Sequence, residues 1–128
     1  MNDMTKMTTE FLAAVPAQDR ERLRTCFESD AVILWPNTNE EFDVEDYLAA
    51  NCDYPGDWDG QVVLTEQTRE GMVAVTRIWA VDGSMSLHVI SFLRFGKTGK
   101  IAGLTEYYSD DGPVPQWRQE MNLGRKTQ

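Results

Sequence analysis

Four consecutive β-type segments constrain the fold of this chain more than any other feature. They span Gln61–Arg69, Met72–Val81, Ser84–Phe95 and Lys100–Ser109. The separators between them are short and carry glycine, as β-hairpin turns do: Glu70-Gly71, Asp82-Gly83 and Gly96-Lys97-Thr98-Gly99. The pattern therefore predicts an antiparallel meander of four strands.

Amphipathic helices are expected before the meander. Thr8 or Thr9 is expected to cap a first helix, and Pro16 either ends it or starts the next one. From Ala17 a second helix gathers three apolar side chains on one side and charges on the other: Leu23, Cys26 and Phe27. An apolar stripe of this kind needs a sheet to cover.

A short strand and a third helix complete the expected elements. Ala31–Trp35 is rich in β-formers and is stopped by Pro36. Asp43 then offers an N-cap for a helix that holds Val44, Tyr47 and Leu48. Helices first and a meander after predict an α+β fold with the helices on one face of the sheet, and 128 residues form one domain.

Charge and composition exclude some classes of binding partner. The 21 acidic side chains exceed the 12 basic ones and give a net charge of −9, which repels phosphate backbones and anionic lipid. We therefore expect no nucleic-acid partner. The sequence shows neither a secretory signal nor an apolar run long enough to cross a bilayer, so we expect no membrane partner and a cytoplasmic location. Cys26 and Cys52 are expected to be free thiols.

The order of helix, strand, helix and long meander resembles the SnoaL-like branch of the nuclear transport factor 2-like superfamily. The most specific parts are Asp30–Asn37, Tyr54–Trp58, and Gly99–Ile101 leading to Glu106–Tyr108 and a Pro-Gln-Trp-Arg tail. The resemblance covers most of the chain, residues 1–128. It implies a cone-shaped, curved antiparallel sheet wrapped around N-terminal helices, a cystatin-like α+β barrel with a hydrophobic cavity open at one end.

The same resemblance leaves the function open. Members of the superfamily include steroid isomerases, polyketide cyclases, epoxide hydrolases and dehydratases, beside pocketed or associative modules that carry out no chemistry. Fold alone does not decide between them.

The last strand carries the candidate acid. Alternation places Glu106, Tyr108 and Asp110 on one face, and the sequence does not say whether that face looks inward. An inward Glu106 in apolar surroundings would act as a general base, with a tyrosine hydroxyl stabilising a developing oxyanion. Alternatively, Glu106 forms a structural pair with an arginine at the sheet margin, or lies at a dimer surface.

His88, the single histidine, is expected on a central strand. It is either a proton relay in the pocket or a structural histidine paired with a neighbouring carbonyl or carboxylate. Trp79 and Arg77 share a face of the preceding strand, which is either cavity lining or a half-buried interface.

Five aromatic residues and one asparagine are the candidate walls of a ligand pocket: Trp35, Asn37, Tyr47, Tyr54, Trp58 and Trp79. Such side chains hold a small apolar molecule, or they simply fill the core of a small domain.

No metal or cofactor is expected. Pro55–Glu66 aligns partly with a calcium loop, but its first position is proline and Gln61–Thr68 alternates like a strand. The sequence has no glycine-rich phosphate cradle and no nucleophile elbow.

The C-terminal segment 112–128 is expected to leave the sheet extended, because Pro113 and Pro115 discourage a helix. Trp117 is expected to lie back on the domain or on a partner subunit. A homodimer through the outer sheet face is the expected assembly.

Two functions follow from these residues. The first is a cofactor-free isomerase, cyclase or dehydratase that acts on a small hydrophobic metabolite, with Glu106 or Asp110 as base and His88 or a tyrosine as relay. The second is a ligand-binding or dimerisation module without chemistry.

Overall fold

The predicted meander forms the larger part of a six-stranded sheet. The computed structural model describes residues 3–127. Its elements, in chain order, are α1 (Asp3–Ala17), α2 (Arg20–Cys26), β1 (Phe27–Trp35), a 3-10 turn (Pro36–Thr38), β2 (Glu40–Phe42), α3 (Val44–Cys52), β3 (Trp58–Gln67), β4 (Gly71–Ala80), β5 (Ser86–Phe95), β6 (Ile101–Asp110) and α4 (Gln116–Gln119). The strand order is β2-β1-β6-β5-β4-β3, and the sheet is open rather than closed.

The α+β prediction is confirmed, with one correction to the sheet. Strands β3 to β6 pair antiparallel in sequence order, as the hairpin turns predicted. However, β1 runs parallel to β6, so the sheet is mixed. The short strand β2, which pairs with the end of β1, was not predicted, because three residues are too few to show alternation.

Glycines allow two of the hairpins to close. A side chain at Gly71 would bring a Cβ within 1.8 Å of the Leu93 carbonyl oxygen on β5. Gly99 has φ +83°, a left-handed conformation that costs glycine least, and its N–H donates to the Gly96 carbonyl. These positions therefore require glycine for different reasons, close backbone approach and turn conformation.

The helix termini match the sequence at α3 only. Helix α2 begins at Arg20 and not at Ala17, Phe27 belongs to β1, and Pro16 lies inside α1, so it neither ends that helix nor starts the next. Asp19 and Asp43 are the N-caps, and each accepts a hydrogen bond from a backbone N–H three residues on. The expected cap at Thr8 or Thr9 is wrong. Both lie inside α1, where their hydroxyls donate to carbonyls one turn back, so these threonines are satisfied mid-helix.

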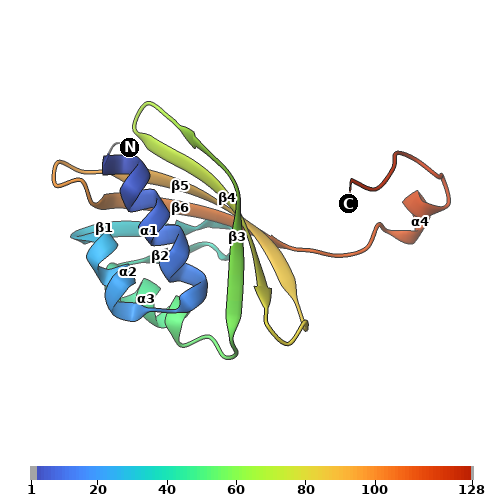
Figure 1. The fold of residues 1–128 in the computed structure, drawn as a ribbon, viewed down its shortest axis with the longest axis horizontal. Helices are drawn as coiled ribbons and strands as arrows, with labels where there is room; N and C mark the ends of the chain where they lie inside the picture. The colour runs from blue at the N-terminus through green and yellow to red at the C-terminus, as the bar shows by residue number, and fades with distance from the viewer. Residues whose placement is uncertain (1–2, 128) are drawn as a thin grey trace.

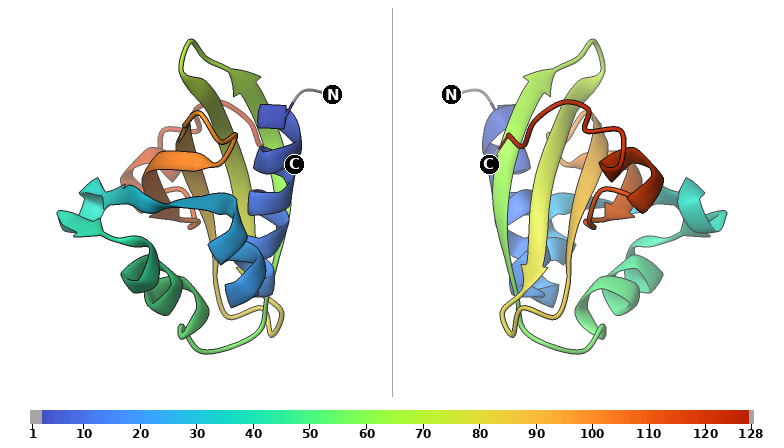
Figure 2. Two further views of the ribbon diagram at one scale, coloured as in Figure 1. Left: turned by 90° about the vertical axis from the view of Figure 1, so that its left-hand side faces the viewer. Right: turned by 90° about the vertical axis from the view of Figure 1, so that its right-hand side faces the viewer.

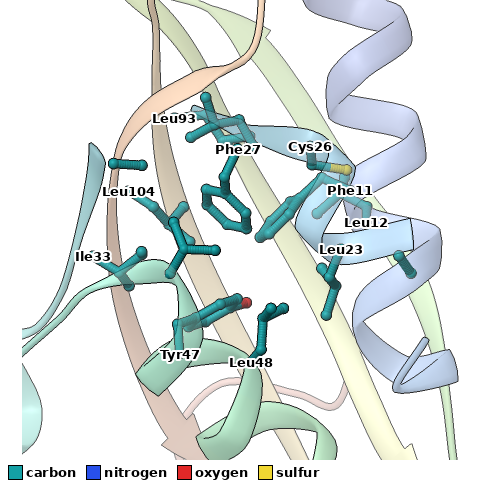
Figure 3. Close-up of a cluster of buried hydrophobic side chains, with 14 of the residues drawn as sticks. Phe11, Leu12, Leu23, Cys26, Phe27, Ile33, Tyr47, Leu48, Leu93 and Leu104 are labelled. Atoms are coloured by element: carbon teal, nitrogen blue, oxygen red, sulfur yellow. The ribbon is translucent and has the colours of Figure 1, made fainter. Parts of the chain in front are cut away.

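The hydrophobic core fills the space between the helices and the inner face of the sheet. Figure 3 shows the rings of Phe11, Phe27 and Tyr47 meeting there, with Leu48 beside Tyr47. Phe27 makes edge-to-face contacts with Phe11 and with Tyr47, at centroid distances of 5.9 and 5.5 Å. Burial of each such side chain contributes about 1.5–3 kcal/mol. Cys26 belongs to this core, and burial raises the pKa of its thiol to about 11.

The sheet curves around the helices and produces the expected cone. Register irregularities interrupt β1, β3 and the end of β5, and β-bulges of this kind bend and twist strands. Helix α1 lies against β3 and β4, and α3 lies under β1, so both cover the same face of the sheet (Figure 2). No helix among residues 3–127 is long and apolar enough to span a membrane.

The C-terminal segment leaves the domain at the end of β6 and stands away from it (Figure 1). It is extended except for the single turn α4, which begins directly after Pro115. Proline is tolerated at the start of a helix, so it did not prevent this turn. Trp117 is 63% exposed and lies beside Arg118, so it does not pack back on its own domain.

Candidate functional site

A cavity of about 400 Å³ opens at the end of the cone where β6 terminates. Most of its wall is apolar, from helix α1 and strands β4 and β5: Phe11, Leu12, Val15, Ile78, Leu87 and Val89. Volumes of this size are typical of small-molecule sites. Exposed Tyr54 and Asp110 border it, so the cavity communicates with solvent on that side.

Glu106 lies in the cavity wall and is only 6% exposed. Ser91 on β5 donates its hydroxyl to Glu106 Oε2 at 2.6 Å, and the Trp35 indole N–H on β1 donates to Oε1 at 3.1 Å. The Ser91 contact follows from the register, because Ser91 and Glu106 are directly opposed across β5 and β6. Two hydrogen bonds from different strands therefore fix the orientation of the carboxyl group.

Two opposing effects act on the pKa of Glu106. Burial raises the pKa of Glu106 above its ordinary value, while the hydrogen bonds from Ser91 and Trp35 act in the opposite direction. Among the described residues no lysine, arginine or histidine forms an ion pair with Glu106. The expected alternative of a structural pair with an arginine at the sheet margin is therefore not what the structure contains.

The structure also identifies which face of the last strand is inward. Glu106, Tyr108 and Asp110 line the cavity, whereas Tyr107 lies on the outer face against Phe92. The Tyr108 ring packs edge-to-face on Trp35 at 5.8 Å between centroids. The strand alternation predicted that these two acidic residues and one tyrosine share a face, and in the structure all three line the cavity.

Three of the six expected pocket-wall residues line the cavity, and they are Trp35, Tyr54 and Trp58. Tyr54 and Trp58 contact each other edge-to-face at 5.5 Å, and the Trp58 indole N–H donates to the Pro55 carbonyl. They form the wall between the end of α3 and the start of β3.

Tyr47 and Asn37, which were expected in the pocket wall, do not line the cavity. Tyr47 is 1% exposed and belongs to the hydrophobic core, where burial, followed by the nearby Glu106 charge, raises its pKa well above the usual value. The Asn37 Oδ1 accepts the backbone N–H of Tyr108 at 3.0 Å, which ties the turn after β1 to β6. Asn37 therefore supports a cavity strand and does not line the cavity.

His88 and Trp79 lie on the outer face of the sheet, which corrects the expectation that they belong to the pocket. The inward residues of β5 are Leu87, Val89 and Ser91, and His88 alternates with them. Its Nδ1 is 2.5 Å from Asp111 Oδ1. His88 is thus separated from Glu106 by the sheet and cannot relay protons to it.

Asp111 organises the polar cluster around His88. It accepts the Ser86 hydroxyl at 2.6 Å and lies 3.8 Å from the Arg77 Nε, while the Arg77 guanidinium stacks on Trp79 at 4.8 Å. Burial alone would raise the pKa of Asp111, but the bonds from Ser86 and His88 lower it below its usual value. Trp79 and Arg77 therefore do not line the cavity, and the alternative that they form an interface stays a prediction.

Four polar residues of the cavity were not predicted: Gln18, Asn51, Thr76 and Ser91. Gln18 has φ +53°, and its Nε2 donates to the carbonyls of Asn51 and Tyr54. A glutamine in the left-handed region has no sequence signature. The inward position of Thr76 and Ser91 could have been found only by fixing the register of the meander against Glu106.

The described residues contain no group of three or more histidine, cysteine, aspartate or glutamate side chains placed to hold a metal ion. The segment with partial calcium-loop spacing enters strand β3 at Trp58, whereas a calcium loop of that type leads into a helix.

Known proteins share this architecture. No protein-family model matches the chain, and curated protein sequences gave no significant match. Among solved structures, a Kribbella flavida protein provisionally described as a ketosteroid isomerase has a TM-score of 0.80 at 19% identity and covers 98% of this chain and 91% of its own. An NTF2-like protein of unknown function from Burkholderia xenovorans has a TM-score of 0.77 at 18% identity, covering 97% and 96%.

A third structure, an LEH-like epoxide hydrolase from M. tuberculosis, has a TM-score of 0.67 at 10% identity, with 84% of this chain and 83% of that chain covered. Identities this low establish the fold and not the activity. The fold is that of nuclear transport factor 2-like proteins, as the resemblance implied.

Proposed function

We propose that this chain, on its nuclear transport factor 2-like fold, binds a small, mostly apolar molecule in the cavity and transfers a proton with Glu106 in a reaction of the isomerase or cyclase type. One observation carries the proposal. The Glu106 carboxyl lies in the cavity wall, buried and without a cationic partner among the described residues, and burial raises its pKa above the ordinary value.

The chemistry uses groups of the inward face of β6. Ionised Glu106 removes a proton from a carbon next to a carbonyl group, and the electron pair of that C–H bond forms an enolate. The Tyr108 hydroxyl, two residues along the same face, stabilises the enolate oxygen by a hydrogen bond. In a substrate with a double bond between its β- and γ-carbons, the enolate is conjugated with that bond. Protonated Glu106 then delivers the proton to the γ-carbon, which shifts the double bond, isomerises the substrate and regenerates the carboxylate.

Ser91 and Trp35 position the base. Their hydrogen bonds to the two carboxyl oxygens hold Glu106 in one orientation and favour its ionised form. The neighbours of known description, a provisional ketosteroid isomerase and an epoxide hydrolase, support a reaction in a cavity of this fold.

The experiment measures proton transfer without knowledge of the natural substrate. The ketone 1-decalone is incubated with the protein in D₂O, and loss of its α-proton signals is followed by NMR. The wild-type protein should accelerate exchange, and Glu106→Gln should lose roughly 100-fold or more of that acceleration. His88→Gln is the matched control, because His88 lies on the other face of the sheet. Equal exchange by wild type and E106Q, with 1-decalone bound, contradicts the proposal.

A non-catalytic binding module is the second candidate. The observation that favours it is that both oxygens of Glu106 already accept hydrogen bonds from the protein. In that case 1-decalone binds to wild type and E106Q with similar affinity, and neither protein accelerates exchange.

We also propose that two copies associate through the outer sheet face. That face exposes apolar side chains of four strands, which a second copy would cover: Val32, Leu64, Ile90, Phe92 and Tyr107, each 39–44% exposed. Exposed apolar side chains that gather on one face are typical of interaction sites.

A further inference from the structure

We infer that residues 112–127, here called the C-terminal arm, bind the outer sheet face of a second copy of this chain. In the pair, the arm of each copy covers three exposed apolar side chains on the other copy: Ile90, Phe92 and Tyr107. The inference rests on the proposed association through that face, and it goes further by naming the segment of the second copy that fills the contact.

The arm exposes apolar side chains that its own domain does not cover. Every residue of the arm is exposed. Four of them are large and apolar, with exposed fractions of 46–63%: Val114, Trp117, Met121 and Leu123. The arm stands away from the domain in Figure 1, and the backbone hydrogen bonds of α4 join arm residues to one another. A segment that buries no apolar side chain cannot offset the entropy cost of being ordered, so the arm needs a surface to bind.

The arm begins on the outer side of the sheet. Asp111, the residue before it, donates its backbone N–H to the Ser86 carbonyl and accepts the Ser86 hydroxyl at 2.6 Å. The other carboxylate oxygen of Asp111 lies 2.5 Å from His88 Nδ1. Ser86 and His88 alternate with the inward residues of β5, so they hold Asp111 on the outer face. The arm therefore leaves the domain at the margin of that face.

Three neighbouring side chains of the outer face form an apolar patch. Ile90 lies directly opposite Tyr107 across β5 and β6, and the Phe92 ring contacts the Tyr107 ring at 6.2 Å between centroids. All three side chains are 39–44% exposed. The indole of Trp117 and the thioether of Met121 suit such a patch, because tryptophan and methionine are enriched at protein interfaces and pack well on aromatic rings.

Two prolines direct the arm toward a second copy rather than back onto its own sheet. Pro115 has φ −57° and ψ 146°, the polyproline II conformation, and Gly112 and Val114 each precede a proline, which favours extended backbone. A spacer of this kind lacks the reversal that a return to its own outer face requires. From Asp111 to Trp117 the chain spans at most about 20 Å, whereas facing sheets pack about 10 Å apart. The arm is therefore long enough to reach a partner.

Charge favours the same partner. The chain from residue 112 onward holds three of the 12 basic side chains and one of the 21 acidic ones, so its net charge is +2, whereas residues 1–111 carry −11. Two such domains repel each other as their faces approach, and a positive arm placed between them reduces that repulsion. The arm thus fits a negatively charged domain that exposes an apolar patch, and a second copy of this chain is such a domain.

The test is complementation between two full-length variants. Trp117→Ala removes the largest apolar group of the arm, and Ile90→Arg disrupts the patch. Each variant alone should self-associate at least about tenfold more weakly than wild type in sedimentation velocity. In an equimolar mixture, the intact arm of the I90R copy can bind the intact patch of the W117A copy. The mixture should therefore form a mixed dimer that is tighter than the dimer of either variant alone.

The control variant is Val81→Ala. Val81 is 64% exposed and lies between β4 and β5, outside both the arm and the patch, so its replacement should leave self-association unchanged. Circular dichroism checks that each variant keeps the fold. If I90R does not fold, Tyr107→Ser takes its place as the patch variant.

Each contrary result has a distinct meaning. If W117A associates as tightly as wild type, the role of the arm is overturned and the proposed sheet-face association stands. If both variants are weakened but their mixture does not recover, the arm binds its own domain and the inference is overturned. If wild type is a monomer, the inference fails together with the proposed association. Proton transfer by Glu106 is measured separately, by exchange of 1-decalone, and does not depend on these outcomes.

Discussion

Replacing Glu106 with glutamine should remove a pH-dependent contribution to stability, and the structure determines its sign. Burial raises the pKa of Glu106 in the folded protein, whereas the unfolded chain has the ordinary value of about 4.5. The folded state therefore holds this proton at pH values where the unfolded state has lost it. The stability that this proton provides is fully present below the unfolded pKa and is lost as the pH rises through the folded pKa.

The magnitude follows from the number of protons. One proton changes the free energy of unfolding by at most about 1.4 kcal/mol per pH unit between the two pKa values. Glutamine has nearly the same shape and can keep contacts with Ser91 and Trp35, but it cannot ionise. Relative to E106Q, the wild-type protein should thus lose stability progressively as the pH rises above the unfolded pKa, and the difference should become constant above the folded pKa.

The assay is urea unfolding followed by tryptophan fluorescence, at a series of pH values from about 4 to about 9. Glu66→Gln at an exposed position of β3 controls for the loss of one negative charge. A difference between wild type and E106Q that does not vary with pH would refute the reasoning, because Glu106 would then titrate alike in the folded and unfolded states.

Three further predictions follow from contacts around the site and the sheet. Trp35→Phe removes the hydrogen bond that lowers the pKa of Glu106, so that pKa should rise further in a ¹³C NMR titration, with a stability loss of about 1–2 kcal/mol. Gly71→Ala forces a Cβ against the Leu93 carbonyl and should cost about 1–3 kcal/mol in urea unfolding, whereas Gly112→Ala, with open space around it, should change stability by less than about 0.5 kcal/mol. Ile90→Arg on the outer sheet face should shift the protein from dimer to monomer in sedimentation velocity, and a mass unchanged from wild type would argue against that interface.

Local patterns in the sequence determined the elements. The alternation and glycine-bearing turns of residues 61–109 predicted β3 to β6 within a few residues, and Asp43 predicted the start of α3. These features depend on neighbours a few positions away in the chain, through turn conformation, capping and side-chain period. For the same reason the sequence grouped Glu106, Tyr108 and Asp110 on one face, and they do line the cavity together.

Only the tertiary structure decided which groups share the cavity. The pairing of Ser91 with Glu106 depends on the length of the β5–β6 turn and on the register irregularity between Arg94 and Phe95. Because side chains alternate with a period of two, a slip of one residue would exchange the faces of a strand. His88 therefore lies outside with Asp111, while Ser91 and Thr76 lie inside. The raised pKa of Glu106 has the same origin, since burial comes from side chains distant in sequence that the curved sheet brings together.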